Sequence, residues 1–142
     1  MNTDLLVDRV RAAVATVDDP EYPGISIVDL GLLESLDTTH DGHVAVGLIP
    51  TFSGCPALSM IADDVRRVVD AVDGVEGVDV RWLGAPVWGV DRVTETARAT
   101  MAREFTVAVR IGRGPVACPR CGSPTHEQSM FGPSRCRAVH NC

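Results

Sequence analysis

The stretch Thr51-Phe-Ser-Gly-Cys-Pro56 connects a predicted strand to the strongest predicted helix of the chain. Before this stretch, apolar residues alternate at positions 44, 46 and 48, as in a strand with one buried face. After it, Pro56 suits the first position of a helix, and apolar residues recur at helical spacing: Leu58, Ile61, Ala62, Val65, Val68, Val69 and Val72. We therefore expect a strand-to-helix turn with Cys55 at the helix start.

A thiol in that position has a specific chemistry. The unpaired N–H groups and the positive end of the helix dipole lower its pKa and favour the thiolate, which binds metals and attacks electrophiles. Thr51 and Ser53 add hydroxyls that can hydrogen-bond a thiolate or a sulfide, and acids cluster at Asp19, Glu21 and Asp29. The alternatives are that Cys55 is a small buried apolar residue and that the acids are turn and capping residues.

The flanking sequence predicts an α+β domain. An amphipathic helix starts near Asp4 and includes Val17, a turn-rich loop covers 21–31, and a hairpin of strands at 32–38 and 44–48 turns at Asp41-Gly42. A third strand is expected at 78–82 and a third helix, capped by Asp91, to about Arg103; residues 105–111 are a further strand or an extended linker. The fold class is thus a small mixed sheet of three or four strands packed with helices, followed by a Cys-rich ribbon tail.

Length and composition restrict the function. A chain of 142 residues is long enough for one domain and a small appendage. The composition is 45% hydrophobic but only 4% aromatic, so the core must be built from aliphatic side chains. The net charge of −6 argues against nucleic acid and for a protein partner. Neither a signal peptide nor a membrane span is expected, so we place the protein in the cytoplasm, where cysteines are ligands or nucleophiles before they are disulfides.

The remaining cysteines lie near the C-terminus. Cys118 and Cys121 form a Cys-x-x-Cys pair, and Cys136 and Cys142 follow within about twenty residues. Four soft ligands on one short loop system are typical of zinc and iron–sulfur sites. A disulfide-linked loop or a solvated, unstructured end are the alternatives. Trp82 and Trp88 are expected to be core or interface anchors, and His40 and His43 surface residues.

Two resemblances sharpen these expectations. Residues 19–31 together with 51–56 resemble the small α+β domain of SufT-like iron–sulfur assembly factors, over about the first hundred residues. That resemblance implies that Cys55 is the reactive cysteine and that Asp19 and Thr51 occupy the other motif positions. It also implies a SufT-like domain over 1–111 that binds a transient iron–sulfur cluster.

The tail, residues 118–142, resembles the end of the PaaD (PaaJ) family of phenylacetate-CoA oxygenase accessory subunits. This implies a zinc-ribbon-like tail over 112–142 in which Cys118, Cys121, Cys136 and Cys142 hold zinc. In that family a second Cys-x-x-Cys begins at the position of Cys142, so the tail is expected to be truncated. The fourth ligand is then Cys136, or His140 or His126 in its place, or the site is incomplete.

The resemblance to PaaD implies an accessory protein of the ring-epoxidising phenylacetyl-CoA monooxygenase in phenylacetate degradation. It would assist iron–sulfur cluster assembly or delivery, with the oxygenase and reductase components as partners and with room for a homodimer. The alternatives are a general iron–sulfur assembly factor, a structural subunit that bridges oxygenase components, and an enzyme with Cys55 as covalent nucleophile. No base is evident beside Cys55 in sequence, which favours a non-catalytic role.

Overall fold

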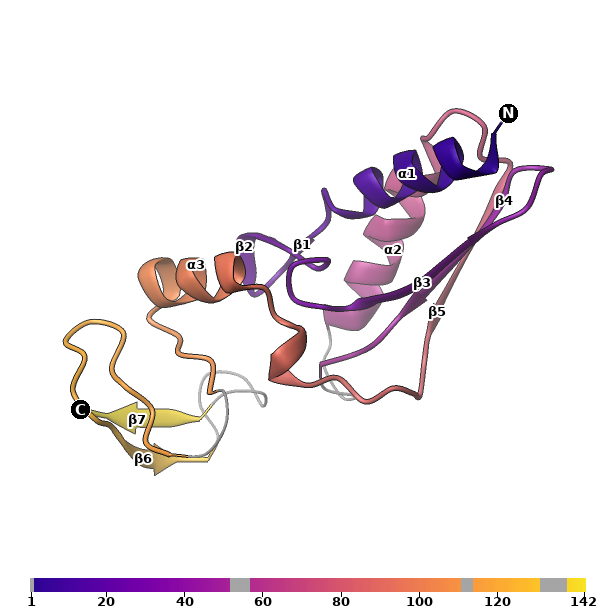
Figure 1. Cartoon of the computed structure of the whole chain (residues 1–142). Coiled ribbons are helices and arrows are strands. Elements are labelled where there is room, and N and C mark those ends of the chain that lie inside the picture. The colour runs from indigo at the N-terminus through magenta and orange to yellow at the C-terminus, as the bar shows by residue number, and fades with distance from the viewer. Residues whose placement is uncertain (1, 52–56, 111–113, 131–137) are drawn as a thin grey trace.

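The computed structural model describes residues 2–51, 57–110, 114–130 and 138–142 (Figure 1). Its elements are, in chain order, α1 (Thr3–Val14), β1 (Asp18–Asp19), β2 (Tyr22–Ser26), β3 (Leu33–Thr38), β4 (His43–Leu48), α2 (Ala57–Asp70), β5 (Gly77–Trp82), the 3₁₀-helix η1 (Val90–Arg92), α3 (Glu95–Phe105), β6 (His126–Ser129) and β7 (Val139–Asn141).

The central sheet has three strands in the order β3-β4-β5. β3 and β4 form the predicted antiparallel hairpin, whereas β5 pairs with β4 in parallel, so the sheet is mixed. A parallel neighbour needs a crossover, and α2 supplies it. α2 packs on β5, and α1 packs on β3 and on α2. The predicted α+β class and mixed sheet are confirmed.

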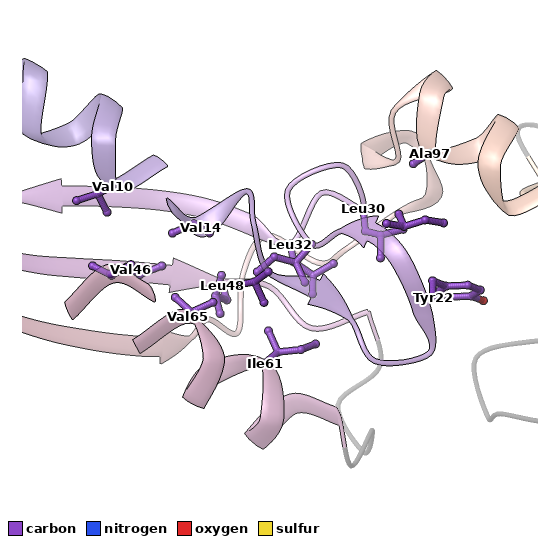
Figure 2. Close-up of a cluster of buried hydrophobic side chains, with 14 of the residues drawn as sticks. Val10, Val14, Tyr22, Leu30, Leu32, Val46, Leu48, Ile61, Val65 and Ala97 are labelled. Atoms are coloured by element: carbon purple, nitrogen blue, oxygen red, sulfur yellow. The ribbon is translucent and has the colours of Figure 1, made fainter. Parts of the chain in front are cut away.

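The core is aliphatic, as the composition predicts. The helical stripes contribute Val10, Val14, Val65 and Val69, all fully buried, and they meet the alternating residues of β4. Figure 2 shows this core as a continuous row from Val10 and Val46 at one end to Tyr22 and Leu30, near α3, at the other. Each fully buried Val or Leu side chain contributes about 1.5–3 kcal/mol to folding.

Some predicted details are wrong. The first helix ends at Val14 rather than at Val17. Asp91 does not cap α3, because it lies in η1, and the Thr94 hydroxyl oxygen accepts the hydrogen bond from Ala97 N at 3.2 Å instead. The expected loop at 21–31 contains β2, which pairs with β1 in a separate two-stranded sheet. Of the two alternatives for residues 105–111, the linker agrees with the structure, because α3 ends at Phe105 and the described residues 106–110 are in no strand.

The C-terminal part is a small ribbon at the end of the molecule opposite the N-terminus (Figure 1). β6 and β7 pair antiparallel, and a bridge joins Ala117 to Pro124. Arg120 Nε donates to Thr106 Oγ1 at 3.2 Å and so ties the ribbon to the end of α3. Within the residues that the structure describes, none of the helices has the length and apolar character needed to cross a membrane.

Candidate functional site and metal centre

Asp19 and Thr51, which the sequence predicts as site residues, line one cavity of about 320 Å³. Thr51 follows β4, the middle strand of the sheet, and Asp19 comes from the short strand β1. Glu21 lines the same cavity, whereas Asp29, the third acid of the predicted cluster, is not among the lining residues. Of the three predicted site residues Cys55, Thr51 and Asp19, the fold therefore brings the last two together from separate elements.

The β1–β2 sheet holds Asp19 in the cavity wall. Asp19 is buried, with 9% of its surface exposed, and its Oδ1 accepts a hydrogen bond from Glu21 N at 2.8 Å. Asp18 Oδ2 accepts one from Gly24 N at 3.0 Å, where Gly24 has a φ of +94°. These Asp-to-backbone bonds fix a tight turn with a carboxylate on its inner side.

Another part of the cavity wall is the segment 88–93, which is hydrogen-bonded to the loop after β2. Trp88 Nε1 donates to Leu30 O at 2.8 Å, and Thr94 N donates to Asp29 O at 2.8 Å. Between them, Arg92 Nε donates to Gly31 O at 2.8 Å. The carbonyl oxygens of residues 29–31 thus each accept one hydrogen bond from this segment. Hydrogen bonds therefore hold this part of the wall in addition to packing.

Arg92 also pairs with Glu34, with Nη2 and Oε2 2.7 Å apart and both side chains partly exposed. Arg92 was not predicted as a functional residue, since no spacing signal distinguishes it from other surface arginines. Trp88 was predicted to be an anchor, and this prediction is confirmed, because Trp88 packs against the core and lines the cavity.

Cys55 lies outside the described residues, so its position at a helix start stays a prediction. The structure does describe both sides of it in sequence. Thr51 lies in the cavity wall, and α2 begins at Ala57 with no acidic residue in its first turn. An acid-free first turn leaves the positive end of the helix dipole uncompensated, which favours an anion there.

The second predicted site is a cluster of thiols in the ribbon. The Sγ atoms of Cys118, Cys121 and Cys142 all lie within 4.8 Å of one another. Cys118 N donates to Ser123 O and Gly122 N donates to Cys118 O, both at 2.8 Å, and Gly122 has a φ of +75°. The Cys-x-x-Cys pair thus forms a closed turn whose left-handed residue is a glycine.

Hydrogen bonds shift the pKa values of two of the thiols, Cys121 and Cys142. The hydroxyl of Ser123, and then its backbone amide, hydrogen-bond the sulfur of Cys121 and lower the pKa of that thiol to about 7; the Cys118 and Cys142 thiols add to the effect. The pKa of Cys142 is raised instead, because it hydrogen-bonds Cys121 and Cys118 and lies beside their charge. The lowered pKa makes the Cys121 thiol a ready source of a thiolate ligand.

The distances fit a tetrahedral metal ion. With metal–sulfur bonds of about 2.3 Å, the sulfur atoms of a zinc site lie about 3.8 Å apart, within the spread observed. Cys136 lies outside the described residues. In the described part of the chain, neither His126 nor His140 belongs to the cluster, and His140 Nδ1 lies 3.1 Å from Thr125 Oγ1. The fourth ligand therefore stays a prediction.

Comparison with known proteins separates the chain into two matches. Residues 7–81 match the model of the family described as iron–sulfur cluster assembly protein. Residues 103–142 match that of the PaaD zinc beta ribbon domain. The expected relationship to both families is confirmed.

Individual proteins agree with these matches. A protein of Escherichia coli (strain K12), provisionally named as one of the subunits of 1,2-phenylacetyl-CoA epoxidase, is 32% identical over 96% of this chain and 86% of its own length. An Fe-S protein maturation auxiliary factor of Porphyromonas gingivalis is 42% identical over 68% of this chain and 93% of its own. Among solved structures, a domain of unknown function from Bacillus anthracis superposes with a TM-score of 0.67 at 25% identity, over 72% of this chain and 96% of that one.

Proposed function

This chain belongs to the family of iron–sulfur cluster assembly proteins, and we propose that it is a maturation factor that carries an iron–sulfur cluster on the Cys55 thiolate and passes it to a client protein. The observation that carries the proposal is the cavity wall shared by Asp19 and Thr51. By the resemblance to the family, these residues occupy the motif positions that accompany the reactive cysteine, and they come from separate elements of the fold. A cluster bound at this wall is cargo, released when the client's own thiolates replace the carrier's.

The proposed roles follow from the chemistry of each group. The Cys55 thiolate is a soft ligand for iron. The Thr51 hydroxyl donates a hydrogen bond to a thiolate or a bridging sulfide, and such bonds tune a cluster and stabilise its ligands. Asp19 fixes the loop beside them through its bond from Glu21 N. With few protein ligands on the carrier, the cluster is held weakly enough to leave.

For the ribbon, we assign a structural zinc ion to Cys118, Cys121, Cys142 and Cys136. The three described thiols already have the spacing that zinc needs, and four protein ligands leave no open coordination position for a reaction. Bound zinc would supply folding free energy to a segment with few apolar residues to bury.

The client we propose is a cluster-bearing component of a ring-epoxidising phenylacetyl-CoA monooxygenase, met in the cytoplasm. The support is the Escherichia coli relative, whose name is that of an epoxidase subunit and whose similarity extends over 96% of this chain. The reductase and oxygenase components are the partners on this proposal. The Porphyromonas gingivalis relative supports the alternative of a general maturation factor.

Substitution of Cys55 distinguishes cluster delivery from catalysis and from a purely structural role. Cells that express the monooxygenase receive either the wild-type chain, Cys55→Ser or Cys55→Ala, and the iron and acid-labile sulfide of the purified reductase component are measured together with turnover. Loss of cluster from the reductase supports delivery. Loss of turnover with intact clusters would instead assign catalysis to Cys55, and unchanged clusters and turnover would leave only a scaffold and overturn the proposal.

A further inference from the structure

The strand β5 has one edge without a partner. β4 pairs with β5 on one side, and within the described residues no strand pairs with the other side, which we call the open edge. β5 contains neither proline nor lysine, the residues that most often protect an exposed edge. An unprotected edge of this kind is a template for another strand.

The backbone groups at the open edge are those of Val78, Val80 and Trp82. Leu83 N donates to Leu48 O at 2.7 Å, so the backbone of the odd-numbered residues within β5 faces β4. Successive residues of a strand direct their N–H and C=O groups to opposite sides. The N–H and C=O groups of the three even-numbered residues therefore point away from β4, and within the described part of the chain they have no partner.

The two side chains on the exposed face of β5 have opposite charges. Asp79 and Arg81 are 56% and 76% exposed, and Arg81 Nε lies 2.6 Å from Asp79 Oδ2. When Val80 lies on a two-fold axis, antiparallel pairing of two copies puts each Asp79 directly opposite Arg81 of the second copy. An axis at Asp79 or at Arg81 would instead put two carboxylates or two guanidinium groups opposite each other. The charges therefore select a second copy of this chain, in one register.

A groove beside Val78 fits the same register. It has a volume of about 430 Å³, and besides Val78 it is lined by four charged residues of α2: Asp63, Arg66, Arg67 and Asp70. None of the described residues of β4 lines the groove, so it lies on the open side of β5. With Val80 on the axis, Trp82 of the second copy lies opposite Val78 and therefore beside this groove.

The Trp82 side chain and the groove have complementary groups. Trp82 packs only partly against the core. Among the residues that the structure describes, neither its indole N–H nor the Asp70 carboxylate has a hydrogen-bond partner. An indole ring also stacks favourably on a guanidinium group, such as that of Arg66 or Arg67. Trp82 of the second copy would therefore fill the groove with its ring against an arginine and its N–H toward Asp70.

We propose that two copies of this chain pair antiparallel through β5, with Val80 on the two-fold axis, so that their sheets join into one sheet of six strands. The interface uses the same groups twice: the backbone of the open edge, the alternating charges of Asp79 and Arg81, and Trp82 in the groove of the other copy. The inference goes beyond the proposed function, and its test does not involve Cys55.

The test uses the full chain and exchanges its charges. Asp79→Arg gives the exposed face of β5 two positive charges and Arg81→Asp gives it two negative ones, so each variant alone places like charges opposite each other in the dimer. The double variant Asp79→Arg/Arg81→Asp reverses the signs and restores opposite charges. Circular dichroism checks that each variant folds, and sedimentation equilibrium measures its mass over a range of concentrations.

We expect the wild type to form a dimer, with a dissociation constant that rises at least about tenfold in each single variant and returns close to the wild-type value in the double variant. An equimolar mixture of the two single variants should form heterodimers, because every arginine then faces an aspartate. Hydrogen exchange at the amides of Val78, Val80 and Trp82 should slow as the wild-type dimer forms.

A monomeric wild type would overturn the proposal, and it is the result expected if a strand of another protein occupies the open edge. A wild-type dimer without protection of these amides would place the interface elsewhere and would also overturn it. The same holds for folded single variants that dimerise like the wild type, or that stay monomeric when they are mixed.

Discussion

At the scale of single residues, Gly31 shows how closely the cavity wall is packed. Its φ is +80°, and a Cβ there would lie 2.4 Å from Arg92 Cβ and 2.6 Å from Arg92 O. The positive φ of Gly31 and its lack of a side chain are therefore both needed for the close contact between the loop after β2 and η1. Gly24 has a similar φ of +94° but open space around it.

This contrast gives a stability prediction. Gly31→Ala should lower the free energy of unfolding by about 3 kcal/mol, from left-handed strain and from overlap with Arg92, whereas Gly24→Ala should lower it by about 1 kcal/mol. Urea denaturation of both variants measures the difference. Equal effects at the two sites would show that the contact with Arg92 does not constrain the loop.

Thr51 gives a prediction on function at the same scale. Thr51→Val removes the hydroxyl at nearly constant shape, and the bound cluster should be lost about tenfold faster, because one hydrogen bond to a charged group is gone. Thr51→Ser keeps the hydroxyl and should retain the wild-type lifetime. Decay of the visible absorbance after reconstitution measures both, and an unchanged lifetime in Thr51→Val would remove Thr51 from the site.

At the scale of secondary structure, the two helical stripes and the hairpin could be predicted because their periods are regular and long. β1 and β2 could not, since Asp18–Asp19 is too short for a pattern and β2 contains Pro23 and Gly24, which indicate a turn. The sequence misplaces the start of α3 because Asp91 and Thr94 are both good capping residues. Only the bond from Thr94 N to Asp29 O, a long-range contact, selects the second.

The corrected cap can be checked directly. Thr94→Ala should destabilise the protein by about 1 kcal/mol, because Ala97 N loses its acceptor. Asp91→Ala, three residues earlier on the exposed side of η1, should change stability by less than about 0.5 kcal/mol. Thermal unfolding of the two variants ranks their stabilities. A larger loss of stability in Asp91→Ala than in Thr94→Ala would favour Asp91 as the cap.

At the scale of the whole molecule, the chain is an acidic assembly domain joined to a cationic ribbon. The cysteine spacing predicts this division, and the clustering of Cys118, Cys121 and Cys142 agrees with it. Sequence spacing could not show that residues 107–110 lie between two cavities, because that depends on how the ribbon packs after α3. The boundary at 111/112 and a homodimer stay predictions.

Removal of metal should affect the two parts differently. If zinc stabilises the ribbon, a chelator should release one metal ion per chain and speed hydrogen exchange in residues 114–142. The amides of β3, β4 and α2 should keep their protection, because the apolar core of the assembly domain contains no metal ligand among its described residues. Loss of protection throughout the chain would show instead that the two parts fold as one unit.

The central claim is that the Cys55 thiolate holds the transferable cluster. Its most direct test is anaerobic reconstitution of purified wild-type and Cys55→Ser protein with iron and sulfide, with measurement of acid-labile sulfide per chain and of zinc in the same sample. We predict that the wild type gains a cluster that an apo-ferredoxin can accept, while Cys55→Ser gains none and keeps its zinc. A Cys55→Ser protein that loads and transfers the same amount of cluster would contradict the account.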